Sequence, residues 1–149
     1  MAKKVLVIDD DEKTVKFISV ALQDHGYETA SAPDGMEGFE KVKSEKPDLV
    51  ILDVMMPKRT GFVLFKLLRK SDEYKEIPVI MLTGVADSLS ELDAKKDDTF
   101  ESPYDKLRES LRKNIQEMRE EGLVKPEMYI DKPIDLDDLA EKVKELIGN

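Results

Sequence analysis

Short apolar runs alternate with amphipathic segments along the chain. Four runs of strand length are almost purely apolar, and a fifth is weaker: VLVI (5–8), LVIL (49–52), PVIML (78–82), MYI (128–130) and the weaker YETAS (27–31). Because these runs lack polar alternation, they predict strands that are buried on both faces of a parallel sheet.

The segments between the runs carry apolar residues at helical spacing. Helices are predicted over residues 12–25, 34–44, 60–70 and 135–147, and the first closes at His25-Gly26, a typical C-terminal stop. We interpret His25 as a solvated residue at the helix end rather than a ligand or a base. The alternation of strands and helices predicts an open α/β sheet with right-handed crossovers.

One connection is about twice as long as a crossover helix requires, namely the one between MLTG (81–84) and MYI (128–130). Ser102-Pro103 in this connection is typical of an N-cap followed by proline at the first helical position. A helix of roughly 18 residues is predicted from there to Gly122, and a shorter one near residues 88–95. We treat residues 1–149 as a single domain with an insertion at about 85–125.

The predicted long helix carries an apolar stripe at spacings of three and four residues. Its members are Tyr104, Leu107, Leu111, Ile115 and Met118. We expect this stripe to pack against the body of the domain, and the alternative is a surface for a partner or for self-association.

Composition narrows the class of protein. The chain has 149 residues, of which 40% are hydrophobic, enough for the core of one typical domain. No apolar run approaches the ~20 residues that a membrane helix needs, and the first run ends in three aspartates, unlike a signal peptide. There is no cysteine, which excludes disulfides and thiolate chemistry. We expect a cytoplasmic protein that does not insert into a membrane.

The charge pattern argues against direct binding of nucleic acid. The formal net charge is −9, and lysines and arginines alternate with acids throughout. A nucleic-acid surface needs a basic patch that neutralises phosphates, and no segment supplies one.

Acidic and polar residues follow the predicted strands at the point where each strand ends. Asp9, Asp10 and Asp11 follow the first strand, Asp53 ends the third, Thr83 ends the fourth and Lys132 follows the fifth. Ligands of open α/β sheets bind outside the carboxyl ends of the strands, so central first and third strands would bring Asp9, Asp10 and Asp53 together. One acid suffices to cap the helix that follows, and Asp11 is the natural cap.

Clustered carboxylates repel one another, so the group makes sense around a hard cation such as Mg²⁺, with the Met55 carbonyl as a further ligand. Lys132 and Thr83 then offer a charge and a hydroxyl to the oxygens of an anion. A cation, a lysine and a hydroxyl around one carboxylate favour phosphoryl transfer, with Asp53 as the attacking group.

The motifs VLVIDDD, LVILDVMMPKRTG, IMLTG and YIDKP, in this order, closely resemble those of the receiver domain of bacterial two-component response regulators. The resemblance covers nearly the whole chain except roughly residues 85–125. It implies a flavodoxin-like fold, a doubly wound five-stranded parallel sheet with strand order 2-1-3-4-5. A long segment with an extra or lengthened helix would lie between the fourth and fifth strands.

The resemblance also implies roles for individual residues. Asp53 would accept a phosphoryl group from a sensor histidine kinase or a phosphotransfer protein. Asp10, Asp53 and the Met55 backbone carbonyl would hold Mg²⁺ directly, and Asp9 would hold it through water. Thr83 and Lys132 would contact the phosphoryl group, and Tyr129 matches the aromatic switch residue that turns inward on activation. The family usually has a short Gly-Ala segment before the last strand, and GLVKPEMYIDKP replaces it here.

We therefore predict a stand-alone receiver that signals to an unidentified protein partner, catalyses only its own phosphorylation and dephosphorylation, and is not otherwise an enzyme. A phosphorylation-dependent homodimer is left open. The main alternative is a receiver-like interaction module that works without phosphorylation. An aspartyl phosphatase is disfavoured because Met55 stands where such enzymes need a second acid. A flavin-binding protein is also disfavoured, because the three acids after the first strand would repel the phosphate of a flavin.

Overall fold

The structure is a computed structural model that describes residues 2–53, 60–83, 113, 116–117, 119–120, 122, 126–131 and 134–148. Five parallel strands form one sheet in the order β2-β1-β3-β4-β5. The strands are β1 (Lys4–Ile8), β2 (Glu28–Ala32), β3 (Leu49–Asp53), β4 (Val79–Thr83) and β5 (Met128–Asp131). The predicted fold class, a flavodoxin-like sheet of order 2-1-3-4-5, is confirmed.

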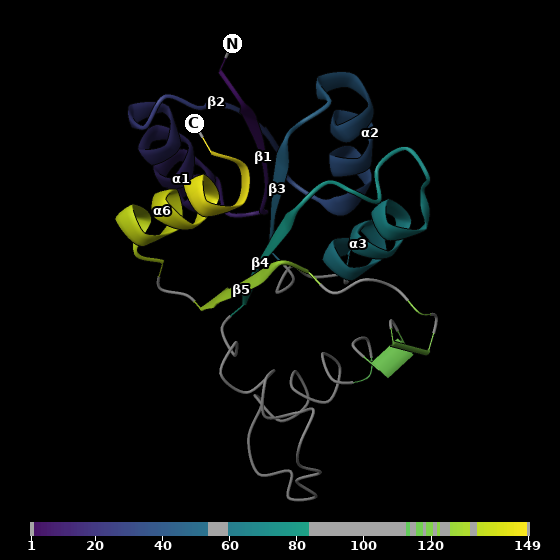
Figure 1. The fold of residues 1–149 in the computed structure, drawn as a ribbon. Helices are drawn as coiled ribbons and strands as arrows, with labels where there is room; N and C mark the ends of the chain where they lie inside the picture. The colour runs from purple at the N-terminus through teal and green to yellow at the C-terminus, as the bar shows by residue number, and fades with distance from the viewer. Residues whose placement is uncertain are drawn as a thin grey trace, which may run out of the picture.

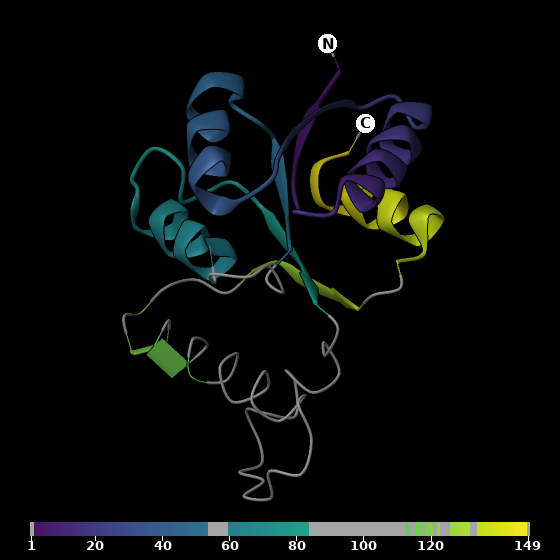
Figure 2. The ribbon, with the colours of Figure 1, turned by 180° about the vertical axis from the view of Figure 1, so that it is seen from behind.

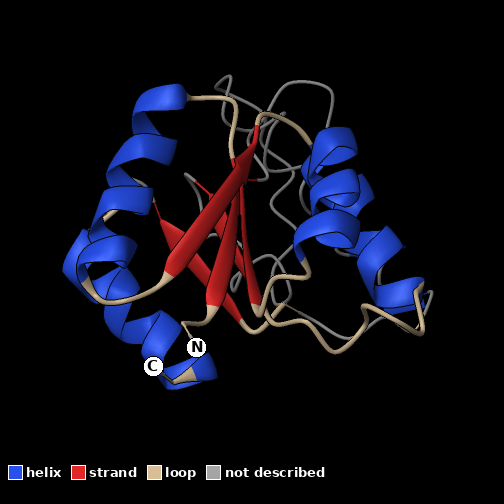
Figure 3. Cartoon of the chain, turned by 90° about the horizontal axis from the view of Figure 1, so that it is seen from above, coloured by secondary structure: helices blue, strands red, loops and turns tan. Residues whose placement is uncertain are grey.

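Helices cover both faces of this sheet. They are α1 (Glu12–Asp24), α2 (Gly35–Glu45), α3 (Thr60–Lys70) and α6 (Leu136–Ile147). In Figures 1 and 2, α1 and α6 lie on one face of the sheet, and α2 and α3 lie on the other. The view from above shows the strands between these two helical layers (Figure 3).

The sheet separates two hydrophobic clusters. One lies between the sheet and the α2/α3 layer, and it includes Leu6, Leu52 and Phe65. The other lies between the sheet and the α1/α6 layer, and it includes Val7, Ile18 and Val143. Alternate residues of the central strands β1, β3 and β4 thus enter opposite clusters, which explains why these strands read as continuous apolar runs.

Local sequence signals account for the helix ends. Asp11, Asp34 and Asp135 are the N-caps of α1, α2 and α6, and each side chain accepts a hydrogen bond from a backbone N–H of the first turn.

Gly38 lies where α2 approaches β1 closely. A Cβ atom built there would stand 2.6 Å from Ile8 Cδ1 and 3.0 Å from Leu64 Cδ2, so any other residue would force these buried side chains to shift.

The end of the chain is held against the start of the sheet. The Tyr27 hydroxyl donates a 2.7 Å hydrogen bond to the Gly148 carbonyl, and Lys3 Nζ donates to the Ile147 carbonyl. Burial raises the pKa of Tyr27 above its usual value. The two chain ends therefore lie near each other at the amino ends of the strands (Figure 1).

Most of the insertion lies outside the described residues, including its predicted short helix and its apolar stripe. Residues 113, 116–117 and 119–120 are helical, and Gly122 has a φ of +73° with its N–H bonded to the Arg119 carbonyl at 2.9 Å. The predicted end of the long helix at Gly122 agrees with this turn. No helix within the described residues is long and apolar enough to cross a membrane.

Candidate functional site

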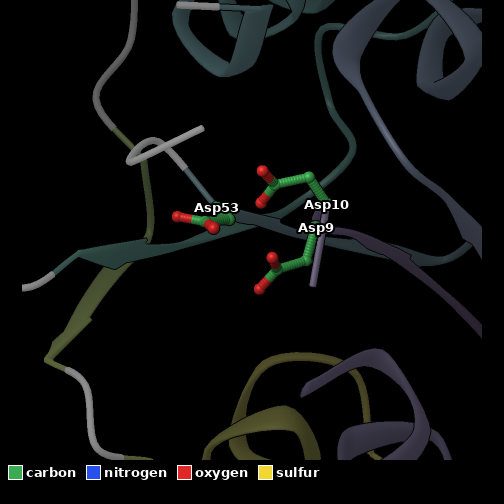
Figure 4. A group of neighbouring side chains, drawn as sticks. All are labelled: Asp9, Asp10 and Asp53. Atoms are coloured by element: carbon green, nitrogen blue, oxygen red, sulfur yellow. The ribbon is translucent and has the colours of Figure 1, made fainter. Parts of the chain in front are cut away.

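Three carboxylates meet at the carboxyl edge of the sheet. Asp9 and Asp10 follow β1, and Asp53 is the last residue of the neighbouring strand β3, whose Leu52 pairs with Ile8. One carboxylate oxygen of each lies within 4.8 Å of the others. In Figure 4, Asp9 and Asp10 extend from the end of β1 toward Asp53 at the end of β3. The predicted convergence of these acids is present in the structure.

The three acids differ in burial. Asp9 and Asp53 are each 2% exposed, whereas Asp10 is exposed. The site therefore has a buried floor of two carboxylates and a solvent-facing rim at Asp10. A cation bound here could keep part of its water shell on the rim side, as Mg²⁺ does in proteins.

Hydrogen bonds fix the turn that carries the acids. The Asp9 N–H donates to the Ala32 carbonyl at 3.2 Å, and Asp9 Oδ1 accepts from the Asp11 N–H at 2.9 Å. Asp11 in turn accepts from the Lys13 N–H and the Thr14 hydroxyl. Asp11 is thus a helix cap, as its position predicts. The hydrogen bond from the Asp9 N–H to the Ala32 carbonyl could not be predicted from the sequence.

Thr83 lies at the same edge of the sheet, on the next strand. It is the last residue of β4 and is fully buried, and its neighbour Leu82 pairs with Asp53. The hydroxyl-bearing residue is therefore one register position beyond the acid, on an adjacent strand. This placement agrees with the expected neighbourhood of Asp53 and Thr83.

Tyr129 lies on β5, the edge strand, where it pairs with Met81. It is partly buried and packs against the cluster on the α2/α3 face. This position is compatible with a core aromatic and with a switch residue, so its switch role stays a prediction. Met55 and Lys132 lie outside the described residues, so the Met55 carbonyl ligand and the lysine contact also stay predictions.

The chemistry of the donor set fits a hard divalent cation. Among the residues that the structure describes, Asp9, Asp10 and Asp53 are the one group of three potential metal ligands this close together. Three carboxylates at this separation repel one another, and a bound divalent cation removes the repulsion. Oxygen donors with one open side suit Mg²⁺ better than a transition metal.

A family model described as "Response regulator receiver domain" matches residues 5–102. The alkaline phosphatase synthesis transcriptional regulatory protein PhoP of Bacillus subtilis (strain 168) is 37% identical over 107 residues, which are 70% of this chain and 44% of that protein. The polar-differentiation response regulator DivK of Brucella anthropi is 26% identical over 149 residues, 100% of this chain and 99% of that one. The chain spans less than half the length of the first transcriptional regulators that it matches.

Solved structures agree with this similarity. Chemotaxis response regulator CheY4 of Vibrio cholerae superposes with a TM-score of 0.67 at 27% identity, covering 98% of this chain and 99% of that one. A putative response regulator from Chloroflexus aurantiacus J-10-fl has the same fold, with a TM-score of 0.70 at 22% identity over the whole of both chains. Together with the acidic edge of the sheet, the family match shows that this chain belongs to the receiver domain family of response regulators.

Proposed function

We propose that this chain accepts a phosphoryl group on Asp53 in a Mg²⁺-dependent reaction, and that a sensor histidine kinase or a phosphotransfer protein donates it. The observation that carries the proposal is the meeting of Asp9, Asp10 and Asp53 at one edge of the sheet. Asp53 ends a fully buried strand, which gives its carboxylate a rigid base. A rigid base favours in-line attack because it limits the geometries that the nucleophile can adopt.

The metal would be held by Asp10, Asp53 and the backbone carbonyl of Met55 directly, and by Asp9 through water. When bound, Mg²⁺ supplies positive charge that neutralises the oxygens of the transferred phosphoryl group. The exposed rim at Asp10 leaves room for the donor to approach.

In the reaction, a carboxylate oxygen of Asp53 attacks phosphorus while the bond from phosphorus to the donor histidine nitrogen breaks. That nitrogen keeps the bonding electron pair, and Asp53 becomes an acyl phosphate. The Thr83 hydroxyl would donate a hydrogen bond to a phosphoryl oxygen, and the Lys132 ammonium would pair with its charge. Water later hydrolyses the acyl phosphate, so the chemistry is limited to the chain's own Asp53.

Phosphorylation adds roughly −1.5 to −2 charge at the edge of the sheet. Thr83 would move toward the new oxygens and Tyr129 would turn inward, which repacks the β4–β5 side of the domain. The two arrangements form an equilibrium that phosphorylation shifts, and a protein partner, or a second copy of the chain, would bind the shifted form.

The test is the intact mass of the chain after incubation with acetyl phosphate, in Mg²⁺ and in EDTA. The wild type and the control Asp72→Asn should gain one phosphoryl group in Mg²⁺ only, because the side chain of Asp72 is fully solvated and far from the chemistry in sequence. Asp53→Asn should gain none. Addition to Asp53→Asn would contradict the proposal, and no addition to the wild type would favour an interaction module that works without phosphorylation.

A further inference from the structure

The length of the connection that leads to β5 does not by itself set the position of the strand. Residues 84–127 separate β4 from β5, and β5 is a four-residue edge strand that pairs with β4 alone. A one-residue change hardly alters the closure entropy of a connection of this length, so its length alone does not select one register. Another interaction has to do so.

Glu127, the residue before β5, makes that interaction with β4 and α3. Its N–H donates to the Val79 carbonyl at 3.0 Å, and its carboxylate accepts from the Val79 N–H at 2.6 Å. The same carboxylate receives two hydrogen bonds from Arg69 Nη2, at 2.9 and 3.1 Å. Glu127 is thereby fixed opposite the first residue of β4.

Arg69 lies in the last turn of α3, and its side chain is only 1% exposed. Its Nη1 donates to the carbonyls of Lys75 and Ile77, at 3.1 and 2.7 Å, in the connection from α3 to β4. The guanidinium also lies over the ring of Phe65, 4.9 Å from its centroid. One buried guanidinium thus joins α3, the α3–β4 connection and the residue that precedes β5.

These contacts are compatible with one register of β5. If the strand slipped so that Pro126 stood opposite Val79, the backbone hydrogen bond would be lost because proline has no N–H. If Met128 stood there, no carboxylate would meet the guanidinium. Either one-residue slip would also exchange the faces of Tyr129 and Ile130, which now enter different hydrophobic clusters.

We propose that Arg69 is a positioning residue for the phosphoryl-transfer reaction, acting through Glu127 to fix the register of β5. The register decides where Tyr129 stands along β4. Lys132, to which the proposed function gives a part in the same reaction, follows three residues later in the chain. This inference rests on the proposed function. Asp9 and Asp10 follow β1 and Asp53 ends β3, so the three acids of the metal site do not depend on the position of β5.

The test compares Arg69→Met with Lys66→Met, a control on the same helix that removes the ion pair with Glu117 instead. Three quantities are measured for each variant. They are the Mg²⁺ dissociation constant, the rate of phosphorylation by acetyl phosphate at saturating Mg²⁺, and the amide hydrogen exchange of β1 and β5 by NMR. Arg69→Lys replaces Arg69→Met if the methionine variant does not fold, because it keeps the charge but has only one nitrogen in place of the separate donors Nη1 and Nη2.

Arg69→Met should lower the phosphorylation rate about tenfold or more, because small displacements of reacting groups are costly. It should leave the Mg²⁺ dissociation constant within about twofold, and speed exchange in β5 but not in β1. Lys66→Met should change none of these. An unchanged rate, or a rate that falls together with Mg²⁺ affinity, would overturn the positioning role.

The failure of the proposed function has a different signature. If the wild type itself takes up no phosphoryl group, both the proposed reaction and the proposed role of Arg69 in it are wrong. The exchange measurement still decides whether Arg69 fixes β5, because it needs no phosphorylation.

Discussion

Replacing Asp10 by asparagine should stabilise the metal-free protein. One oxygen of each carboxylate lies within 4.8 Å of the others. Two unit charges at that separation repel by roughly 0.9 kcal/mol in bulk water and by about 3.5 kcal/mol at an effective dielectric of about 20. Because Asp10 is exposed, the lower value applies to each of its two neighbours, and the variant should gain about 1–2 kcal/mol.

The assay is thermal unfolding in EDTA and in excess Mg²⁺. For a chain of this size, that gain corresponds to a rise in Tm of about 3–6 °C in EDTA. In excess Mg²⁺ the Tm of the wild type should rise to that of the variant or above it. A bound ion at a hundred times its Kd stabilises the folded protein by about 2.7 kcal/mol, and the variant binds Mg²⁺ less well because it lacks the Asp10 carboxylate. In about 1 M NaCl the gain in EDTA should shrink, because the Debye length falls to about 3 Å.

Asp72→Asn is the matched control, because it removes the same charge from a fully solvated position. It should leave Tm nearly unchanged in both buffers. The reasoning would be refuted if Asp10→Asn were no more stable than the wild type in EDTA, or if Mg²⁺ raised the Tm of both equally. The first result would mean that the three carboxylates do not repel one another in the metal-free protein, and the second that Asp10 is not a metal ligand.

Two further predictions concern packing and pH. Gly38→Ala should lower the free energy of unfolding, measured in urea, by about 1–2 kcal/mol. The steric overlap of the new methyl group with buried Ile8 and Leu64 outweighs a helix-propensity gain of about 1 kcal/mol. Adding Ile8→Val to this variant should recover part of the loss, because it removes the Cδ1 atom nearest to the new methyl group. Tyr27→Phe should lose about 1 kcal/mol near neutral pH with the bond to Gly148. Because the raised pKa of Tyr27 disfavours the phenolate in the folded state, wild-type stability should fall as pH rises above about 10, and Tyr27→Phe should show less of this fall in an alkaline titration of unfolding.

The central strands could be located from the sequence to within a residue because burial on both faces leaves a continuous apolar signal. The weaker signal of YETAS also has a physical cause. Its strand, β2, lies at the edge of the sheet with mostly half-exposed or exposed residues, and it begins at Glu28. PVIML was predicted one residue too early. Pro78 precedes β4, and only its carbonyl joins the sheet, by accepting from the Val50 N–H at 3.0 Å.

The candidate site was predictable at Asp9, Asp10, Asp53 and Thr83 because a parallel sheet gathers the ends of its strands at one edge. The sequence could not tell that Asp9 is buried and Asp10 exposed, since that depends on the path of the turn after β1. Nor could it pair Arg69 with Glu127. They are 58 residues apart, and single charges in a chain rich in charges carry no sign of their partners.

The contacts of Lys3 and Tyr27 with the end of α6 hold both chain ends at the amino ends of the strands. Asp9, Asp10 and Asp53 lie at the other edge of the sheet, at the carboxyl ends of the strands. Reporter groups fused to the two ends would therefore stand close together and away from the reaction. A short peptide joining the ends should close the chain into a ring without strain, since it would span a gap that hydrogen bonds already bridge. Such a ring would be harder to unfold, because its unfolded state has fewer conformations to gain.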